Sequence, residues 1–200
     1  EYDGSRMSYD IEFVTTDPSK EVVLLEDDKV QVCSFPLSHK VPTTGFKFIQ
    51  KEKQRHLLVD KAKSHGVKIE HYHLLKEGVD VVNEDGKEFK SIDYTLPGEP
   101  EKSYAFCSDT KYSEAIISSI KNVELLYHEA TFTEEFIDRA KATMHSTAIQ
   151  AATIAKMANV GKLLMGHLSA RYEDGVQHIE EATPIFQNCE IVEDGNTYTV

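Results

Sequence analysis

The sequence lacks several features that would assign it to a special class of protein. No stretch approaches the ~20 consecutive apolar residues of a membrane-spanning helix, and no signal-peptide pattern opens the chain. Only three cysteines are present, without a Cys-x-x-Cys pair, which argues for a reducing, cytoplasmic compartment. There is no internal repeat and no low-complexity tract. These absences favour a globular protein without a membrane partner.

What is present suits a folded domain. The chain has 200 residues, of which 40% are hydrophobic and 28% charged, so it is long enough for a core and is not disordered in composition. It begins at Glu1 rather than at a methionine, and we therefore expect that a preceding segment is missing.

Charge is spread unevenly along the chain. The formal net charge is −12, which on its own argues against a polyanionic partner such as nucleic acid. Residues 39–68, however, hold eight basic and two acidic residues, a net +6, which leaves −18 for the other 170 residues. The basic stretch is either a solvated helix face or a contact surface for phosphates.

The hydrophobic pattern predicts strands first and then alternating strands and helices. Expected strands in the first fifty residues are 9–14, 21–25, 30–35 and 45–49, followed by a helix over 51–65 that ends at Gly66 and a hairpin over 79–86. Further along we expect strands at 104–107, 123–127 and 163–165, helices at 113–120 (with Ser113 as N-cap), 133–141, 147–157 and 176–187 before Pro184, and a closing hairpin over 189–200. This order predicts an α/β fold with a sheet covered by helices.

Histidines and carboxylates follow the predicted strands. Asp109 comes after 104–107, His128 and Glu129 come after 123–127, and His167 comes after 163–165. Ligands gather at the carboxyl ends of parallel strands, so these side chains are candidates for one site.

Two more histidines extend this set. His39 follows the predicted strand 30–35, and His145 lies where a helix should begin. Imidazole nitrogen with carboxylate oxygen is a typical zinc donor set, and a bridging carboxylate would permit two ions. Taken singly, each of these residues also fits a polar loop position.

Other histidines point elsewhere. His71 and His73 form the only His-x-His pair but lack a third partner at a fixed spacing, so we interpret them as structural or substrate-facing. His56, His65 and His178 are expected at the surface.

Four ordered motifs carry a family resemblance. They are Ser108-Asp109-Thr110, Tyr127-His128-Glu129-Ala130-Thr131-Phe132, His145-Ser146-Thr147 and Gly166-His167-Leu168-Ser169-Ala170-Arg171-Tyr172, with an upstream segment around His39. Together they resemble ribonuclease Z, the tRNA 3′-processing endonuclease of the metallo-β-lactamase fold. The resemblance implies an αββα sandwich and a zinc-dependent endoribonuclease that acts on precursor tRNA.

The resemblance also implies roles for matching residues. His39, Asp109 and His167 would bind zinc, with Asp109 bridging two ions, and His145 would stand beside the scissile phosphate. His128 and Glu129 would orient the ligands and the neighbouring loop, whereas Ser169, Arg171 and Tyr172 would brace the loop of His167. Asp109 and Glu129 are, with His145, the candidate catalytic residues.

Three departures from the family pattern qualify this reading. The motif HxHxDH, expected upstream of His39, is absent, which predicts an N-terminally truncated domain with only part of the ligand set for two zincs. Ser108 replaces the usual glycine before the aspartate. No Gly/Pro-rich arm separates His39 from Asp109.

The lysine-rich segment could replace that arm. We interpret 1–200 as one domain in which 47–95 is an insertion or substrate-facing segment, with Lys47, Lys51, Lys53 and Arg55 as candidate substrate contacts. The family is typically a homodimer, which the resemblance implies here.

Three hypotheses remain open at the level of sequence. The first is a truncated ribonuclease Z, the second another phosphodiesterase or hydrolase of this fold, and the third a non-catalytic binding module. The basic stretch and the motifs around Glu129 and His167 favour the first, whereas the missing HxHxDH keeps the third open.

Overall fold

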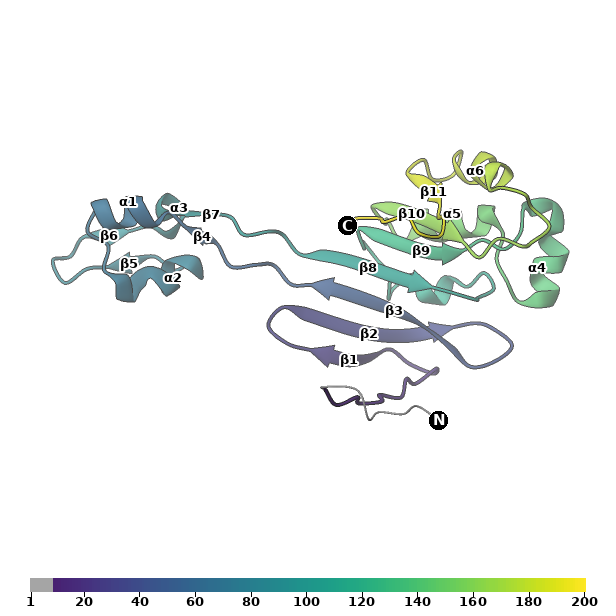
Figure 1. The fold of residues 1–200 in the computed structure, drawn as a ribbon, viewed down its shortest axis with the longest axis horizontal. Coiled ribbons are helices and arrows are strands. Elements are labelled where there is room, and N and C mark those ends of the chain that lie inside the picture. Colours follow the sequence, from purple (N-terminus) through teal and green to yellow (C-terminus); the bar gives the residue numbers. More distant parts are fainter. Residues whose placement is uncertain (1–8) are drawn as a thin grey trace. The chain divides into compact units, whose positions relative to one another are not determined.

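The computed structural model describes residues 9–200, which divide into two compact units (Figure 1). Unit 1 contains the residues up to 25 together with 32–48 and 104–200, and unit 2 contains 26–31 and 49–103. Unit 2 overlaps most of the predicted insertion 47–95, while the assignment of the whole chain to one domain stays a prediction. No helix of the described residues is long and apolar enough to cross a membrane.

The sheet of unit 1 has seven strands in the order β1-β2-β3-β8-β9-β10-β11. Neighbouring strands β8, β9, β10 and β11 run parallel, and Leu126 of β9 is the register partner of both Ala105 and Leu163. The bounds are β1 Val22–Glu26, β2 Val30–Leu37, β3 Thr43–Gln50, β8 Lys102–Cys107, β9 Leu125–Glu129, β10 Lys162–Gly166 and β11 Cys189–Ile191. This parallel half confirms the predicted α/β class.

Two helices pack against the parallel strands of unit 1, α5 Ala148–Met157 and α6 Val176–Ala182. The unit also contains α4 Ile137–Thr143 and 3-10 turns at Glu114–Ile116 and Glu134–Phe136. Helix α5 buries its alanines in the same core cluster as β9 and β10, because small side chains let a helix lie close to a sheet (alanines 148, 151, 152 and 155). The near-continuous apolar runs of β9 and β10 fit strands buried on both faces.

Several sequence predictions for local structure are wrong. Residues 9–14 form no strand, and 113–120 holds only a short 3-10 helix, whose N-cap Ser113 makes no side-chain capping bond. The end of the chain is not a hairpin, because β11 pairs in parallel with β10. In 51–65 only Val59–Ser64 (α1) is α-helical.

Long-range pairing explains the error in 51–65. The Lys53 N–H donates to Glu99 O, and the Arg55 N–H donates to Lys76 O, at 3.0 and 3.1 Å. These bonds to distant segments override a helix propensity that is worth only tenths of a kcal/mol per residue.

Unit 2 has its own small core. Its elements are β4 His56–Leu57, α1, a 3-10 turn Ile69–His71, α2 Tyr72–Lys76, β5 Val81–Val82, β6 Glu88–Phe89, α3 Ser91–Tyr94 and β7 Thr95–Leu96. Strands β5 and β6 pair antiparallel, which confirms the predicted hairpin, and β4 pairs with β7. The core contains Leu75 and Phe89, both essentially without exposed surface.

We expect Leu75→Ala to destabilise unit 2 selectively. Truncation of a fully buried leucine costs about 3 kcal/mol, through lost burial and the cavity left behind. Hydrogen exchange should accelerate in 56–96 and stay unchanged in β9 and β10. The control is Ile69→Ala, since Ile69 is 75% exposed, and equal exchange in the two variants would contradict the assignment of a separate core.

Candidate metal centre

Five polar side chains meet at one edge of the sheet of unit 1. Asp109 follows β8, Glu129 ends β9 and His167 follows β10, and the carboxyl ends of these parallel strands share one edge. His39 follows β2, and His145 lies between α4 and α5. Possible ligand atoms of His39, Asp109 and His145 lie within 4.8 Å of one another, as do those of Glu129, His145 and His167. We call these five residues the site cluster.

Each histidine of the site cluster has its Nδ1 atom beside an acceptor. The distances from Nδ1 are 2.9 Å to Met144 O for His39, 2.7 Å to Glu129 Oε1 for His145, and 2.9 Å to Thr131 Oγ1 for His167. The ring centroids of His39 and His167 lie 5.0 and 5.2 Å from that of His145. With all three Nδ1 atoms engaged, Nε2 is the nitrogen that each ring can offer to a metal, and that of His167 lies 3.5 Å from Asp109 Oδ1.

Glu129 is the buried centre of this network. Its Oε1 accepts from Thr110 N (2.9 Å) and lies 2.7 Å from His145 Nδ1. Its Oε2 accepts from Thr131 N (3.1 Å), Thr131 Oγ1 (2.7 Å) and Ser146 N (3.1 Å). The side chain has no exposed surface, whereas that of His145 is 15% exposed. Glu129 is therefore suited to hold the neighbouring groups in place rather than to meet a substrate.

The donor set fits a divalent metal ion. His167 Nε2 lies 3.5 Å from Asp109 Oδ1, and both side chains are partly exposed. When the proton of His167 is on Nδ1, its Nε2 and the Asp109 oxygen are both hydrogen-bond acceptors and face each other. A cation between them would offset the repulsion of their lone pairs. His39, Asp109, His145 and His167 could all contribute ligand atoms.

Backbone geometry near the site cluster is unusual. Met144 and His167 are non-glycine residues with φ of 63° and 58°. Such left-handed conformations cost roughly 1–2 kcal/mol and often occur at functional sites. Gly166, directly before His167, leaves room for the side chain of Tyr127, since a Cβ there would lie 2.6 Å from Tyr127 Oη.

The residues expected to brace the site lie around it. Arg171 Nε donates to Ser169 Oγ at 3.2 Å, and its guanidinium lies 4.3 Å from the centroid of Phe136. Tyr172 Oη accepts from Thr133 N at 3.0 Å. These contacts join the loop after His167 to the segment after β9, which supports the bracing role but does not test it.

His128 and His178 lie inside the protein. His128 Nδ1 lies 2.6 Å from the backbone oxygen of Glu129, and burial lowers the pKa of its ring. His128 contacts Glu129 but is not part of the site cluster. The prediction that His178 is a surface residue is wrong, because it has no exposed surface and packs edge-on against Tyr172, at 4.5 Å between ring centroids.

The candidate substrate contacts all have partners within the chain. Lys47 pairs with Glu21, Lys51 with Glu26 and Lys53 with Glu99, and Arg55 Nε donates to Thr95 Oγ1. Partly exposed ion pairs of this kind contribute about 0–1 kcal/mol, so the lysines could exchange these partners for phosphate. His71 and His73 belong to unit 2, His71 at 3.9 Å from Glu70.

Sequence reasoning missed three hydroxyl residues that complete the site. Thr131 contacts Glu129 and His167, Ser146 Oγ donates to Thr110 O at 2.7 Å, and the Thr110 N–H donates to Glu129. Each lies within a motif that was recognised. Their adjacency to Asp109, Glu129 and His145 was the available signal.

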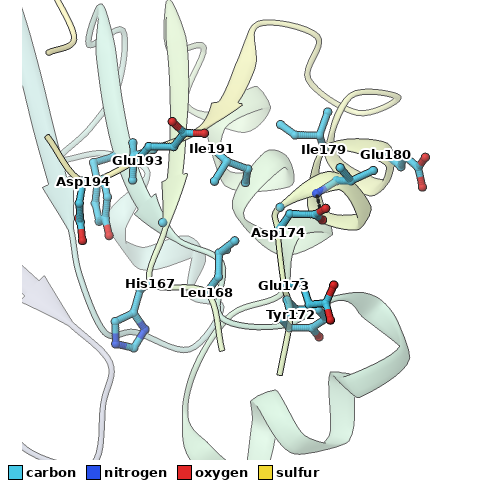
Figure 2. A pocket seen from close by; sticks show the side chains of 15 residues that line it. His167, Leu168, Tyr172, Glu173, Asp174, Ile179, Glu180, Ile191, Glu193 and Asp194 are labelled. Atoms are coloured by element: carbon cyan, nitrogen blue, oxygen red, sulfur yellow. Dashed lines mark hydrogen bonds between the residues drawn. The ribbon is translucent and has the colours of Figure 1, made fainter. Parts of the chain in front are cut away.

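A cavity of about 770 Å³ opens beside His167 (Figure 2). Leu168, Ile179 and Ile191 give it an apolar part, and it is rimmed by acidic side chains (Glu173, Asp174, Glu180, Glu193 and Asp194). Acidic groups repel a phosphate backbone, so this cavity is a poor path for RNA toward the site cluster.

Comparison with known proteins relates the chain to one group. No protein-family model matches it. It is 43% identical over 182 residues to the ribonuclease Z of Porphyromonas gingivalis, an alignment that covers 91% of this chain and 60% of that protein. It is 36% identical over 201 residues to the ribonuclease Z of Cytophaga hutchinsonii, covering 100% of this chain and 64% of that protein. The chain thus spans less than two thirds of the length of these relatives.

Solved structures show the same fold. The metallo-β-lactamase-fold protein YhfI of Bacillus subtilis matches with a TM-score of 0.58 at 16% identity, covering 93% of this chain and 55% of that one. Human short-form tRNase Z matches with a TM-score of 0.52 at 21% identity, covering 88% and 45%.

These matches and the site cluster place the chain in the class of metallo-β-lactamase-fold proteins. Within that class, nearly all of its 200 residues are similar to part of the proteins named ribonuclease Z.

Proposed function

We propose that the protein carrying this chain is a zinc-dependent endoribonuclease that removes the 3′ trailer from precursor tRNA. The observation that carries the proposal is the site cluster, in which three histidines engaged at Nδ1 surround one partly exposed carboxylate. Support comes from the identity of 36–43% to relatives named ribonuclease Z.

In this proposal, His39, Asp109 and His167 would hold zinc. When bound, zinc supplies Lewis acidity, which makes water more acidic and offsets charge that develops on phosphoryl oxygens. HxHxDH would supply the further ligands in the intact site, so we propose that the 200-residue chain alone is incomplete and inactive.

His145 is the proposed proton donor to the leaving 3′ oxygen. Its Nδ1 lies 2.7 Å from Glu129 Oε1, so that carboxylate can accept a hydrogen bond from the Nδ1–H and offset the positive charge of a ring that carries protons on both nitrogens. A proton on Nε2 is then available at the open side of the cluster. Cleavage after the discriminator nucleotide would leave a tRNA with a free 3′-hydroxyl and a trailer with a 5′-phosphate.

The remaining proposals concern partners and location. Lys47, Lys51, Lys53 and Arg55 would contact the tRNA backbone, which is recognised by shape rather than by sequence. We further propose a homodimer in the cytoplasm. In agreement with a reducing compartment, Cys33, Cys107 and Cys189 are free thiols, and burial raises the pKa of Cys107 well above its usual range.

We expect His145→Ala to reduce cleavage of a precursor tRNA by at least about 10²-fold in kcat, with little change in KM. The measurement is steady-state cleavage over a range of precursor tRNA concentrations by the protein that carries this chain. The control, His73→Ala, removes an exposed histidine of unit 2. Unchanged kcat in His145→Ala would contradict the proposed role. A coding sequence without HxHxDH upstream of Glu1 would contradict the proposed function itself.

A further inference from the structure

The hydroxyl of Thr131 lies between Glu129 and His167 and contacts both side chains. Its Oγ1 lies 2.7 Å from Glu129 Oε2, 2.9 Å from His167 Nδ1 and 3.3 Å from His145 Nδ1. The residue is only 6% exposed, and these three groups are polar partners of its hydroxyl. The hydroxyl has one proton, so it can donate a hydrogen bond to only one of these three neighbours at a time.

The position of that proton follows from the chemistry of the neighbours. An ionised carboxylate only accepts hydrogen bonds, so the shortest contact, to Glu129 Oε2, requires the proton of Thr131 Oγ1. If the hydroxyl donated to His167 instead, its oxygen would face the carboxylate oxygen at 2.7 Å with no proton between them. The hydroxyl therefore donates to Glu129 and accepts from His167.

His167 must then carry its proton on Nδ1. A neutral imidazole has one protonated nitrogen, so Nε2 keeps its lone pair, at 3.5 Å from Asp109 Oδ1. His145 does not depend on Thr131 in the same way, because Glu129 Oε1 is closer to its Nδ1, at 2.7 Å against 3.3 Å.

The backbone of Thr131 holds the same loop. Its carbonyl oxygen accepts from the Ser169 N–H at 3.0 Å, and its own N–H donates to Glu129 Oε2 at 3.1 Å. His167 is thus fixed from two directions, at its ring and two residues further along the chain. These contacts hold a residue whose φ is 58°.

We propose that Thr131 is a positioning residue that sets His167 in the Nδ1–H tautomer and so presents Nε2 as the metal-binding atom. Its relevance to catalysis rests on the proposed function, but the tautomer itself does not. Oriented ligands bind metal more tightly, and loss of such an outer partner typically costs about 10–100-fold in metal affinity.

The test compares Thr131→Val, which removes the hydroxyl at nearly constant shape, with Thr131→Ser, which keeps it. Long-range ¹H–¹⁵N spectra of the metal-free protein that carries this chain, at a pH where the histidines are neutral, report the tautomer of each ring. We expect His167 to be Nδ1–H in the wild type and in Thr131→Ser, and to lose this preference in Thr131→Val. His145 should keep its tautomer in all three and is the internal control.

A second measurement is the zinc affinity of the same proteins, by competition with a chromophoric chelator. We expect Thr131→Val to bind zinc about 10–100-fold more weakly, and Thr131→Ser to bind it like the wild type. An Nε2–H tautomer at His167 in the wild type would overturn the proposal even if Thr131→Val did not fold. Equal behaviour of the two variants would also overturn it. A tautomer shift as expected in a protein that does not cleave precursor tRNA would refute the proposed function alone.

Discussion

Replacing Glu129 with glutamine is expected to lower the free energy of unfolding by about 3 kcal/mol and to reduce turnover by about 10³-fold. The carboxylate is completely buried, and each of its oxygens faces at least two donor groups. Glutamine keeps the shape but turns one of the oxygens into an NH₂ donor. Whichever end carries the NH₂, buried N–H or O–H groups then face another donor.

The less costly orientation of the amide has a specific consequence for His145. If the NH₂ group takes the place of Oε1, the Thr110 N–H loses its acceptor, but His145 can adapt by losing the Nδ1 proton and accepting there. The ring of His145 would then keep its one proton on Nε2, and no carboxylate would remain to stabilise the doubly protonated ring that the proposed proton donor requires. Stability and catalysis should therefore fall together.

Urea unfolding of the chain and single-turnover cleavage by the protein that carries it measure the two effects. The matched control is Glu135→Gln, the same chemical change at an exposed position six residues away. A Glu129→Gln protein with wild-type stability would contradict the assignment of Glu129 as the centre of the network. Loss of turnover in Glu135→Gln would indicate a nonspecific effect.

The sequence was sufficient to locate the site cluster because its members occupy positions with a physical meaning. A βαβ order requires parallel strands, and the carboxyl ends of parallel strands lie at the same edge of the sheet. Asp109 and His167 directly follow such strands, and Glu129 is the last residue of one. Their convergence was thus predictable without side-chain geometry. The role of each residue stays a proposal.

Side-chain partnerships were not predictable in the same way. Thr131 is one of many threonines, and only its position between Glu129 and His167 makes its hydroxyl special. Likewise, Lys51 and Lys53 were recognised as basic, but their partners Glu26 and Glu99 are more than twenty residues away in the chain. Charge counted along a sequence does not show which charges meet in space.

The helix prediction over 51–65 is wrong in its first part for a related reason. Composition predicts an element from its own residues, whereas 51–55 is held extended by backbone bonds to Glu99 and Lys76. The burial of His178 is a similar case, since its environment depends on Tyr172 packing against it. Both outcomes depend on contacts that arise only when the chain folds.

Replacing Asp109 with asparagine is expected to separate the two effects that Glu129→Gln combines. The free energy of unfolding should hardly change, whereas turnover should fall on the order of 10⁴-fold. Asp109 is partly exposed, and it faces the unprotonated Nε2 of His167 at 3.5 Å. An amide NH₂ in its place could donate to that nitrogen, so the metal-free protein should be as stable as the wild type or slightly more so. The negative charge that binds a cation would nevertheless be gone.

Thermal unfolding with and without zinc measures how much bound zinc stabilises each variant. A ligand that binds only the folded state stabilises it by about 2.7 kcal/mol when present at one hundred times its Kd. Wild type and the control Asp138→Asn, whose side chain is 97% exposed, should gain such stabilisation, whereas Asp109→Asn should gain little. If Asp109→Asn were as strongly stabilised by zinc as the wild type, Asp109 would not be a ligand. If Asp109→Asn were less stable than the wild type in the absence of zinc, the Asp109 carboxylate would be a structural group like that of Glu129. Removal of a group that only binds metal should not destabilise the metal-free protein.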